Sequence, residues 1–412
     1  MEKKHPDIPP DMDAAFDRGE SVGMMEPMIV SGSSPHRAGL ADLALELAEE
    51  SAAFHAGLPV GASASLADLV RGMNCYYSNL IEGHNTHPVD IERALRNDYS
   101  NDIRKRDLQL EAKAHIAVQQ WIDGGGVRGR AATVEAIREI HRRFCSLLPP
   151  DLLWVSDADG SRKRPVSPGE LRKDDVRVGR HVAISPGAVP RFLSRFAEAY
   201  TGLGRVDAIL AAASAHHRLL WIHPFPDGNG RVARLMTHAM LSDVLDTGAV
   251  WSVARGLAHN EARYKAGLAA CDTGRRNDLD GRGTLSEEEL AAFTRFFLET
   301  CLDQVRFMRG LVEPGKLRAR ILAWAEEETR AQRLPPKAGA VLEAVLYRGN
   351  LPRADVQTLV GSTDRHARRI TSALVRAGVL TADNDRAPFR LAWPARLAAR
   401  WMPGLFPEKT SG

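Results

Sequence analysis

The sequence predicts a mainly α-helical protein that carries one small β-hairpin and ends in a winged helix-turn-helix. Apolar residues recur every three or four positions through most of the chain, which is the spacing of helices that bury one face. Only residues 176–184 alternate polar and apolar side chains about a central glycine, a pattern typical of a short hairpin. Three helical segments and an extended stretch with an internal turn follow Pro336, in the element order of a winged helix-turn-helix.

Local signals place the helices of the first half of the chain. Thr133 has the side chain of an N-cap, and Gly83 has the conformational freedom of a C-cap. Pro88 suits the start of a short helix. The helices expected there cover residues 39–56, 66–81, 89–96, 108–122, 133–148 and 190–200.

Helical periodicity also dominates the second half of the chain. Two helices flank residues 223–230, and others are expected at residues 290–307, 317–330, 338–347, 353–359 and 364–377, followed by an extended stretch over 379–393. Residues 277–287 are similar to a calcium-binding loop, but Arg276 would fill its first ligand position and Gly283 its apolar position. We therefore expect a capped loop there rather than a calcium site.

Composition limits the class of protein. The chain has 412 residues, enough for two or three domains, and 55 basic residues nearly balance 52 acidic ones. This balance argues against a protein that coats nucleic acid, although a local basic patch stays open. The four cysteines have no paired spacing, and no apolar run is long enough to span a membrane. We expect a cytoplasmic protein without a signal peptide or a membrane contact.

Changes in composition divide the chain into five regions. Residues 1–38 are rich in Pro, Met, Gly and Ser and are expected to form a loosely draped arm. An N-terminal helical region follows over residues 39–125, and the central helical core covers residues 126–312. A connecting helix is expected at residues 313–334, before the winged-helix domain at residues 335–412.

One stretch, His223 to Arg234, concentrates reactive side chains between two helical patterns. Pro224 and Pro226 forbid a continuous helix through it. The next helix then opens at a glycine-rich turn whose free N–H groups suit an anion. A histidine, a carboxylate, these amides and two arginines together suit chemistry on a polyphosphate.

This stretch matches the signature of the Fic family, HPFx(D/E)GNGRxxR, at every fixed position. The resemblance extends to residues 78–83, which are similar to the family's inhibitory motif, (S/T)xxxE(G/N). Residues 169–172 and the hairpin 176–185 lie where the family has its target-docking flap. The resemblance covers about residues 40–310, and it implies a Fic-type helical core with an inhibitory helix before it; many relatives also end in a winged helix.

The resemblance implies transfer of AMP from ATP and Mg²⁺ to a Ser, Thr or Tyr hydroxyl of a target protein, and of the chain itself. His223 is then the base that takes the proton of the hydroxyl. The residues of the glycine-rich turn, Gly228, Asn229 and Gly230, stabilise the attacked phosphate through their N–H groups. Asp227 would hold Mg²⁺.

The two arginines of the signature complete the implied phosphate site. Arg231 and Arg234 lie three positions apart on one helix, and the resemblance assigns them to the β- and γ-phosphates. Asn260 and Tyr264 are similar to residues that line the family's nucleotide pocket. The target protein is expected to dock on the hairpin 176–185 by strand addition.

Two side chains of the inhibitory motif share a helix face, because Ser78 and Glu82 are four positions apart. Without the resemblance, Glu82 is an ordinary surface residue at a helix end. With it, Glu82 is expected to pair with Arg234 and deny that arginine to the γ-phosphate. The chain would then be a self-inhibited protein adenylyltransferase.

Two other functions stay open at this point. A Fic-type enzyme can instead remove AMP or transfer another phosphate-containing group. Alternatively, the chain is a transcriptional regulator whose core senses a nucleotide and whose winged helix binds DNA. The third helix of that domain is basic, with Arg365, His366, Arg368, Arg369 and Arg376. The winged helix could equally serve packing or homodimerisation.

Overall fold

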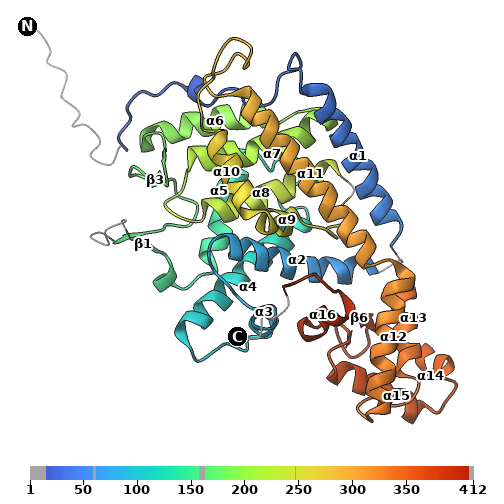
Figure 1. The fold of residues 1–412 in the computed structure, drawn as a ribbon. Coiled ribbons are helices and arrows are strands. Elements are labelled where there is room, and N and C mark those ends of the chain that lie inside the picture. Colours follow the sequence, from blue (N-terminus) through green and yellow to red (C-terminus); the bar gives the residue numbers. More distant parts are fainter. Residues whose placement is uncertain (1–14, 59–61, 157–162, 246, 408–412) are drawn as a thin grey trace, which may run out of the picture.

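The structure is a computed structural model that describes residues 15–58, 62–156, 163–245 and 247–407. It confirms the mainly α prediction, since helices form nearly all of the described core (Figure 1). Among the described residues, no helix is both long and apolar enough to cross a membrane.

Two packed helices form the centre of the fold, α7 (Arg205–Ile222) and α8 (Asn229–Val244). Both helices are buried on nearly all sides. They therefore lack the single apolar face that is typical of a helix at the surface. Two long helices, α1 (Arg37–Ala56) and α11 (Glu287–Leu311), run side by side along one edge of this centre (Figure 1). The helices α5 (Val134–Ser146) and α6 (Val189–Tyr200) pack on the other side.

A second group of helices covers the start of α8. Helix α2 (Ala62–Ile81) packs against α4 (Ile103–Asp123) and α9 (Val253–His259), with α3 (Pro88–Leu95) beside α4. Helix α10 (Glu261–Ala270) follows α9. Helix α4 starts five positions before the expected start of 108, because the Asp102 side chain accepts from the Lys105 N–H and caps the helix there.

Two hairpins emerge between α5 and α6. The predicted one pairs β3 (Arg177–Val178) with β4 (His181–Val182). The sequence did not reveal the other, in which β1 (Trp154–Ser156) pairs with β2 (Lys163–Pro165). Its strands are short and largely exposed, so they carry no alternation of apolar residues.

The described part of the N-terminal arm is packed, so the prediction of a loose arm is wrong for residues 15–36. Met25, Met28 and Val30 are buried in the core. The Tyr200 hydroxyl donates to the Met28 carbonyl at 2.6 Å. A short 3₁₀ turn, Val22–Met25, shapes the arm, and residues 1–14 lie outside the described residues.

The loop before α11 is closed by its own side chains. The Asp280 carboxylate accepts from the Ser286 hydroxyl at 2.9 Å and from the Glu288 and Arg276 N–H groups at 2.8 and 3.1 Å. An oxygen set used in this way caps a helix start. The structure therefore favours the capped loop over a calcium site.

The C-terminal module, residues 335–407, follows α12 (Pro314–Arg330) and holds the expected order of elements. These are α13 (Ala338–Arg348), α14 (Asp355–Val360), α15 (Asp364–Arg376) and a pair of strands, β5 (Leu380–Thr381) with β6 (Arg390–Leu391). The short helix α16 (Ala398–Trp401), which the sequence did not predict, turns the chain back toward α2. There the Tyr77 hydroxyl donates to the Leu405 carbonyl at 3.0 Å.

Candidate active site

His223 stands where α7 ends, in the left-handed conformation with φ 51° and ψ 62°. This conformation is uncommon for a residue other than glycine, and here it turns the chain away from the helix into the proline-rich loop. The ring Nδ1 lies 3.3 Å from the Leu220 carbonyl oxygen. Because a carbonyl only accepts, Nδ1 carries the proton and Nε2 keeps its lone pair. His223 therefore offers a proton-accepting nitrogen.

The surroundings keep the His223 ring neutral. Burial is the main cause that lowers the pKa of His223 from 6.5 to about 4, and the nearby charges of Arg172 and His181 act in the same direction. At neutral pH the imidazole is therefore in its basic form. A histidine in this state can accept a proton from a hydroxyl but does not carry a positive charge of its own.

Asn229 fixes the loop between the two central helices. Its Oδ1 accepts from the Phe225 N–H at 3.0 Å, and its Nδ2 donates to the Phe225 carbonyl at 2.9 Å. Phe225 is fully buried, and its ring stacks on that of His141 at 3.9 Å. The Asn229 side chain thus holds the backbone of Phe225. The group that Asn229 can offer to a phosphate is its own backbone N–H.

The start of α8 has the backbone conformation that the predicted anion site requires. Gly228 precedes the helix with φ 78°, a conformation that favours glycine, and the first N–H groups of the helix have no acceptor within it. Asp227, which is exposed, lies directly before this turn. One carboxylate together with substrate phosphates is the ligand set that Mg²⁺ prefers, so Asp227 fits the ion. Among the described residues no group of three or more His, Cys, Asp or Glu forms a complete metal site.

Arg234 is buried and bound to the end of α2. Its Nε donates to the Ser78 hydroxyl at 2.8 Å, and its Nη2 donates to the Ser78 carbonyl at 3.2 Å and to the Glu82 carboxylate. Its side chain is 3% exposed, against 34% for Glu82. Burial raises the pKa of Glu82, but the charge and hydrogen bond of Arg234 outweigh it, so the pKa lies below its usual value. The structure therefore brings together the three residues that the sequence associated.

Arg231 has a partner that the sequence did not indicate. Its Nη2 donates to Glu111 Oε2 at 2.9 Å, and its guanidinium lies over the Phe144 ring at 5.2 Å. The same carboxylate oxygen lies 2.8 Å from His84 Nδ1. Glu111 comes from α4, far from the signature in sequence, and no short motif marks it. Arg231 is thus held by a carboxylate, as Arg234 is.

The two residues assigned to the nucleotide pocket differ in burial: Asn260 is exposed and Tyr264 is buried. Asn260 is exposed at the start of α10, and its Nδ2 donates to the Gly256 carbonyl at 3.0 Å. Tyr264 is 2% exposed, and its hydroxyl lies 2.7 Å from His216 Nε2. Burial raises the pKa of Tyr264 to about 12. Tyr264 therefore supports the site from within the core and presents no hydroxyl to a pocket.

A cavity of about 600 Å³ opens between the two hairpins and reaches the signature at Pro226. Charged side chains of both signs line it, including Arg164, Lys173, Asp174 and Arg177. On the β3–β4 hairpin, Val178 and Val182 are exposed. The hairpin and the cavity together form an extended surface that reaches the signature loop at Pro226.

Residues 131–241 match the family model described as the Fic/DOC family. This part of the chain is a Fic/DOC domain. The matched Fic segment runs from before α5 into α8, so it includes His223, Asp227 and both arginines. Glu82, Glu111 and the C-terminal module lie outside it.

Curated relatives of the Fic domain include two fly proteins. The chain is 27% identical over 168 residues to protein adenylyltransferase Fic of Drosophila erecta, covering 40% of this chain and 31% of that protein. It is 29% identical over 171 residues to the protein of the same name from Drosophila persimilis, covering 40% and 30%. The chain therefore spans less than a third of the length of the curated relatives it matches. A solved structure of Fic-1 from C. elegans shares the fold, with a TM-score of 0.50 and 18% identity over 68% of this chain and 74% of that one.

We expect His223 to remain neutral down to about pH 4, because its pKa in the folded chain is about 4. In the unfolded chain the ring takes up a proton below its usual pKa of 6.5, whereas in the folded chain it does so only near pH 4. The contribution of His223 to the free energy of unfolding is therefore fully present above pH 6.5 and is lost as the pH falls toward 4. The Hε1 resonance of His223, assigned with His223→Asn, reports the midpoint. His84 is the control, since Glu111 raises its pKa. A midpoint between 6 and 7 for His223 would contradict the assigned environment.

Gly230 leaves room for the Glu82 carboxylate, which a Cβ at this position would overlap. We expect Gly230→Ala to displace Glu82 from Arg234 and to lower the free energy of unfolding by about 2 kcal/mol. Gly72→Ala on α2 is the matched control, because a Cβ there meets open space and only helix propensity changes. Thermal unfolding measures both. If the two variants were equally stabilised, the carboxylate would not occupy this space.

Proposed function

We propose that this chain is a protein adenylyltransferase that Glu82 holds inactive. The observation that carries the proposal is the neutral His223, with Nε2 unprotonated, close in sequence to a helix start without a side-chain cap and to two buried arginines. The names of the relatives, protein adenylyltransferase Fic, support the same reaction.

The reaction begins when His223 Nε2 accepts the proton of a Ser, Thr or Tyr hydroxyl. The hydroxyl oxygen attacks the α-phosphorus of ATP, an O–P bond forms, and the bond to the β-phosphate oxygen breaks. AMP is then esterified to the protein, and pyrophosphate leaves. The N–H groups of residues 228–230 stabilise the negative charge on the α-phosphate as it develops.

Asp227 and the arginines would organise the triphosphate. Asp227 would hold Mg²⁺, which neutralises phosphate charge when bound. Arg231 and Arg234 would bind the β- and γ-phosphates once their present carboxylate partners give way. The target would extend the exposed edge of the β3–β4 hairpin as an added strand, since an edge strand leaves backbone groups unpaired.

Glu82 supports self-inhibition through the position of its carboxylate. It takes the donor of Arg234 that a γ-phosphate would need, and it also lies over Gly230 at the start of α8. Two negative groups cannot share this space, because the carboxylate and the phosphate repel each other. Inhibition of this kind leaves the rest of the site assembled.

A DNA-binding regulator is the second candidate, and it rests on α15. Arg365, Arg369 and Arg376 are exposed on this helix, as is Arg368, which pairs with Asp364. Salt-dependent binding of a DNA duplex by the full chain would favour this function. Removal of AMP by the same site is an alternative that uses the same residues.

The deciding experiment follows label from α-³²P-ATP and Mg²⁺ onto protein. We expect weak labelling of the wild type, at least tenfold more with Glu82→Gly, and none with the double variant Glu82→Gly/His223→Ala. Glu135→Gly, which changes an exposed glutamate on α5, is the matched control and should label as the wild type does.

Either of two results would contradict the proposal. Equal labelling of the wild type and Glu82→Gly would exclude self-inhibition by Glu82. Labelling of the double variant would show that His223 is not the base.

A further inference from the structure

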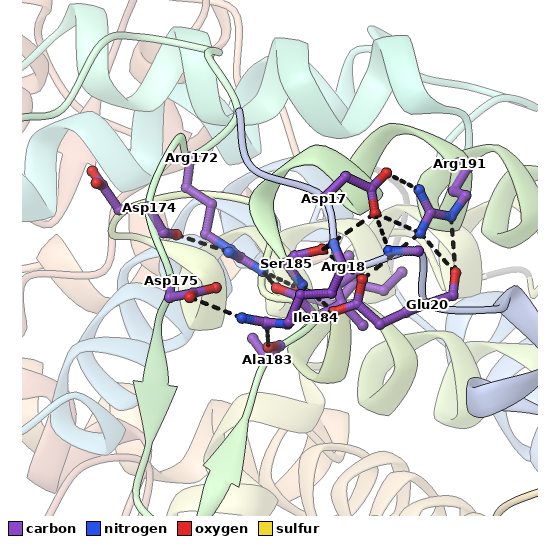
Figure 2. A network of polar contacts seen from close by, with 12 residues as sticks. Asp17, Arg18, Glu20, Arg172, Asp174, Asp175, Ala183, Ile184, Ser185 and Arg191 are labelled. Atoms are coloured by element: carbon purple, nitrogen blue, oxygen red, sulfur yellow. Dashed lines mark hydrogen bonds and ion pairs between the residues drawn. The ribbon is translucent and has the colours of Figure 1, made fainter. Parts of the chain in front are cut away.

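Arg172 lies between the β3–β4 hairpin and the signature loop, with only 2% of its surface exposed. Its Nε donates to the His223 carbonyl at 2.7 Å, and its Nη2 donates to the Ile184 carbonyl at 2.5 Å (Figure 2). Its Nη1 donates to the Asp174 carbonyl at 2.8 Å. The Arg172 N–H itself donates to the Pro224 carbonyl at 2.9 Å. One side chain thus joins both ends of the hairpin to the loop that bears His223.

Such a buried guanidinium has an unusual set of partners. Burial lowers the pKa of Arg172 to about 10, so the group is still charged at neutral pH. Its side-chain hydrogen bonds go to carbonyl oxygens, while the carboxylates of Asp175 and Glu20 act on it through their charge. A buried charge is expensive to keep. We therefore ask what this buried charge does between the β3–β4 hairpin and the loop that bears His223.

The carbonyl that Arg172 holds belongs to a strained residue. His223 has a positive φ, and its neighbours must hold such a conformation in place. The backbone angles of His223 set the direction of its carbonyl, and they also set the direction of the loop and the position of the ring. A hydrogen bond from a charged donor to the carbonyl oxygen fixes that direction.

The other side of the hairpin base is held by the N-terminal arm. The Arg18 N–H donates to the Ser185 hydroxyl at 3.0 Å, and Arg18 Nη1 donates to the Asp175 carboxylate at 2.9 Å. The Ser185 N–H donates to Glu20 Oε1 at 2.7 Å. Figure 2 shows that these contacts are continuous with those of Arg172 through the segment Ala183–Ser185.

The arm is itself anchored to α6. Arg191 donates from Nε to the Glu20 carbonyl at 2.9 Å and from Nη2 to the Asp17 carboxylate at 2.9 Å. The Gly187 N–H donates to the Phe16 carbonyl at 2.8 Å, and a Cβ at Gly187 would overlap the arm. The hairpin base is therefore fixed from the arm on one side and by Arg172 on the other.

We propose that Arg172 is the positioning residue of the active site, which couples the seating of the β3–β4 hairpin to the placement of His223. In this role it acts through the His223 carbonyl, which accepts a hydrogen bond from its Nε. The inferred effect of Arg172 on the reaction rests on the proposed function. Its inferred effect on the His223 ring is independent of that function. A target strand that docks on the hairpin would meet a base already aimed at the α-phosphate.

The test compares Arg172→Gln and Arg172→Lys in the Glu82→Gly chain. We expect Arg172→Gln to lower kcat by about 30-fold while KM for ATP changes less than about twofold, because a misplaced base slows the chemical step and not ATP binding. The midpoint of the His223 titration should rise, since Arg172 no longer repels the proton. Arg172→Lys keeps the charge and should leave that midpoint low, with an intermediate kcat.

Arg218→Gln is the matched control. Arg218 is also fully buried, and its Nη2 donates to the Pro27 carbonyl at 2.8 Å, away from the signature loop. Its loss should lower the Tm but not raise the His223 midpoint. If Arg172→Gln lowered only the Tm, as Arg218→Gln does, or raised KM with kcat unchanged, the positioning role would be overturned.

The result also separates this inference from the proposed function. If no variant transferred AMP but the His223 ring of Arg172→Gln lost the Nδ1-protonated form that faces the Leu220 carbonyl, the adenylyltransferase would be excluded and the positioning role supported. If AMP transfer proceeded and the midpoint did not move, the positioning role would be wrong. Should Arg172→Gln not fold, the kcat of Arg172→Lys decides, since an unchanged kcat contradicts the role.

Discussion

The buried charge of Arg234 constrains the rest of this structure, because a guanidinium away from water is costly unless acceptors meet its donors, and an anion beside it compensates the charge most strongly. In the present state the end of α2 supplies that anion through Glu82, and Ser78 accepts from Nε and Nη2 of Arg234. A triphosphate would supply it in another state. Under the proposed function the two partners would exclude each other, so the contact that stabilises α2 against α8 would also close the site.

Several elements far apart in the chain converge on this arrangement. Glu111 of α4 holds Arg231, and the chain end beyond α16 meets α2 one residue before Ser78, where Tyr77 donates to Leu405. Arg255 on α9 reaches the same chain end through the Gly404 carbonyl at 2.8 Å. The C-terminal module is therefore joined to α2, the helix that carries Ser78, by a hydrogen bond at Tyr77.

Local signals predicted the local structure, the family resemblance predicted the distant pairing of Glu82 with Arg234, and other contacts between distant residues were missed. His223, Asp227 and both arginines lie within one short stretch, and prolines, glycines and periodicity place them at the junction of two helices. The hairpin at 176–185 and the helical order of the C-terminal module follow from the same local signals. Glu111 and Arg172 act through contacts with residues distant in sequence. No pattern marks Glu111, and the resemblance included Arg172 in the segment 169–172 without giving this side chain a role. The packing of the arm was missed because its high Pro and Gly content hides the pattern of a few buried methionines. The burial of Tyr264 was missed because it depends on neighbours from other helices.

The competition between Glu82 and the γ-phosphate is tested most directly by comparing ATP and ADP binding by calorimetry, in the wild type and in Glu82→Gln. The account predicts nearly equal affinities for the two nucleotides in the wild type, because Arg234 is occupied. In Glu82→Gln, ATP should bind at least about tenfold more tightly than ADP, as expected for one added charge-assisted contact. The same ATP-to-ADP ratio in both proteins would contradict it.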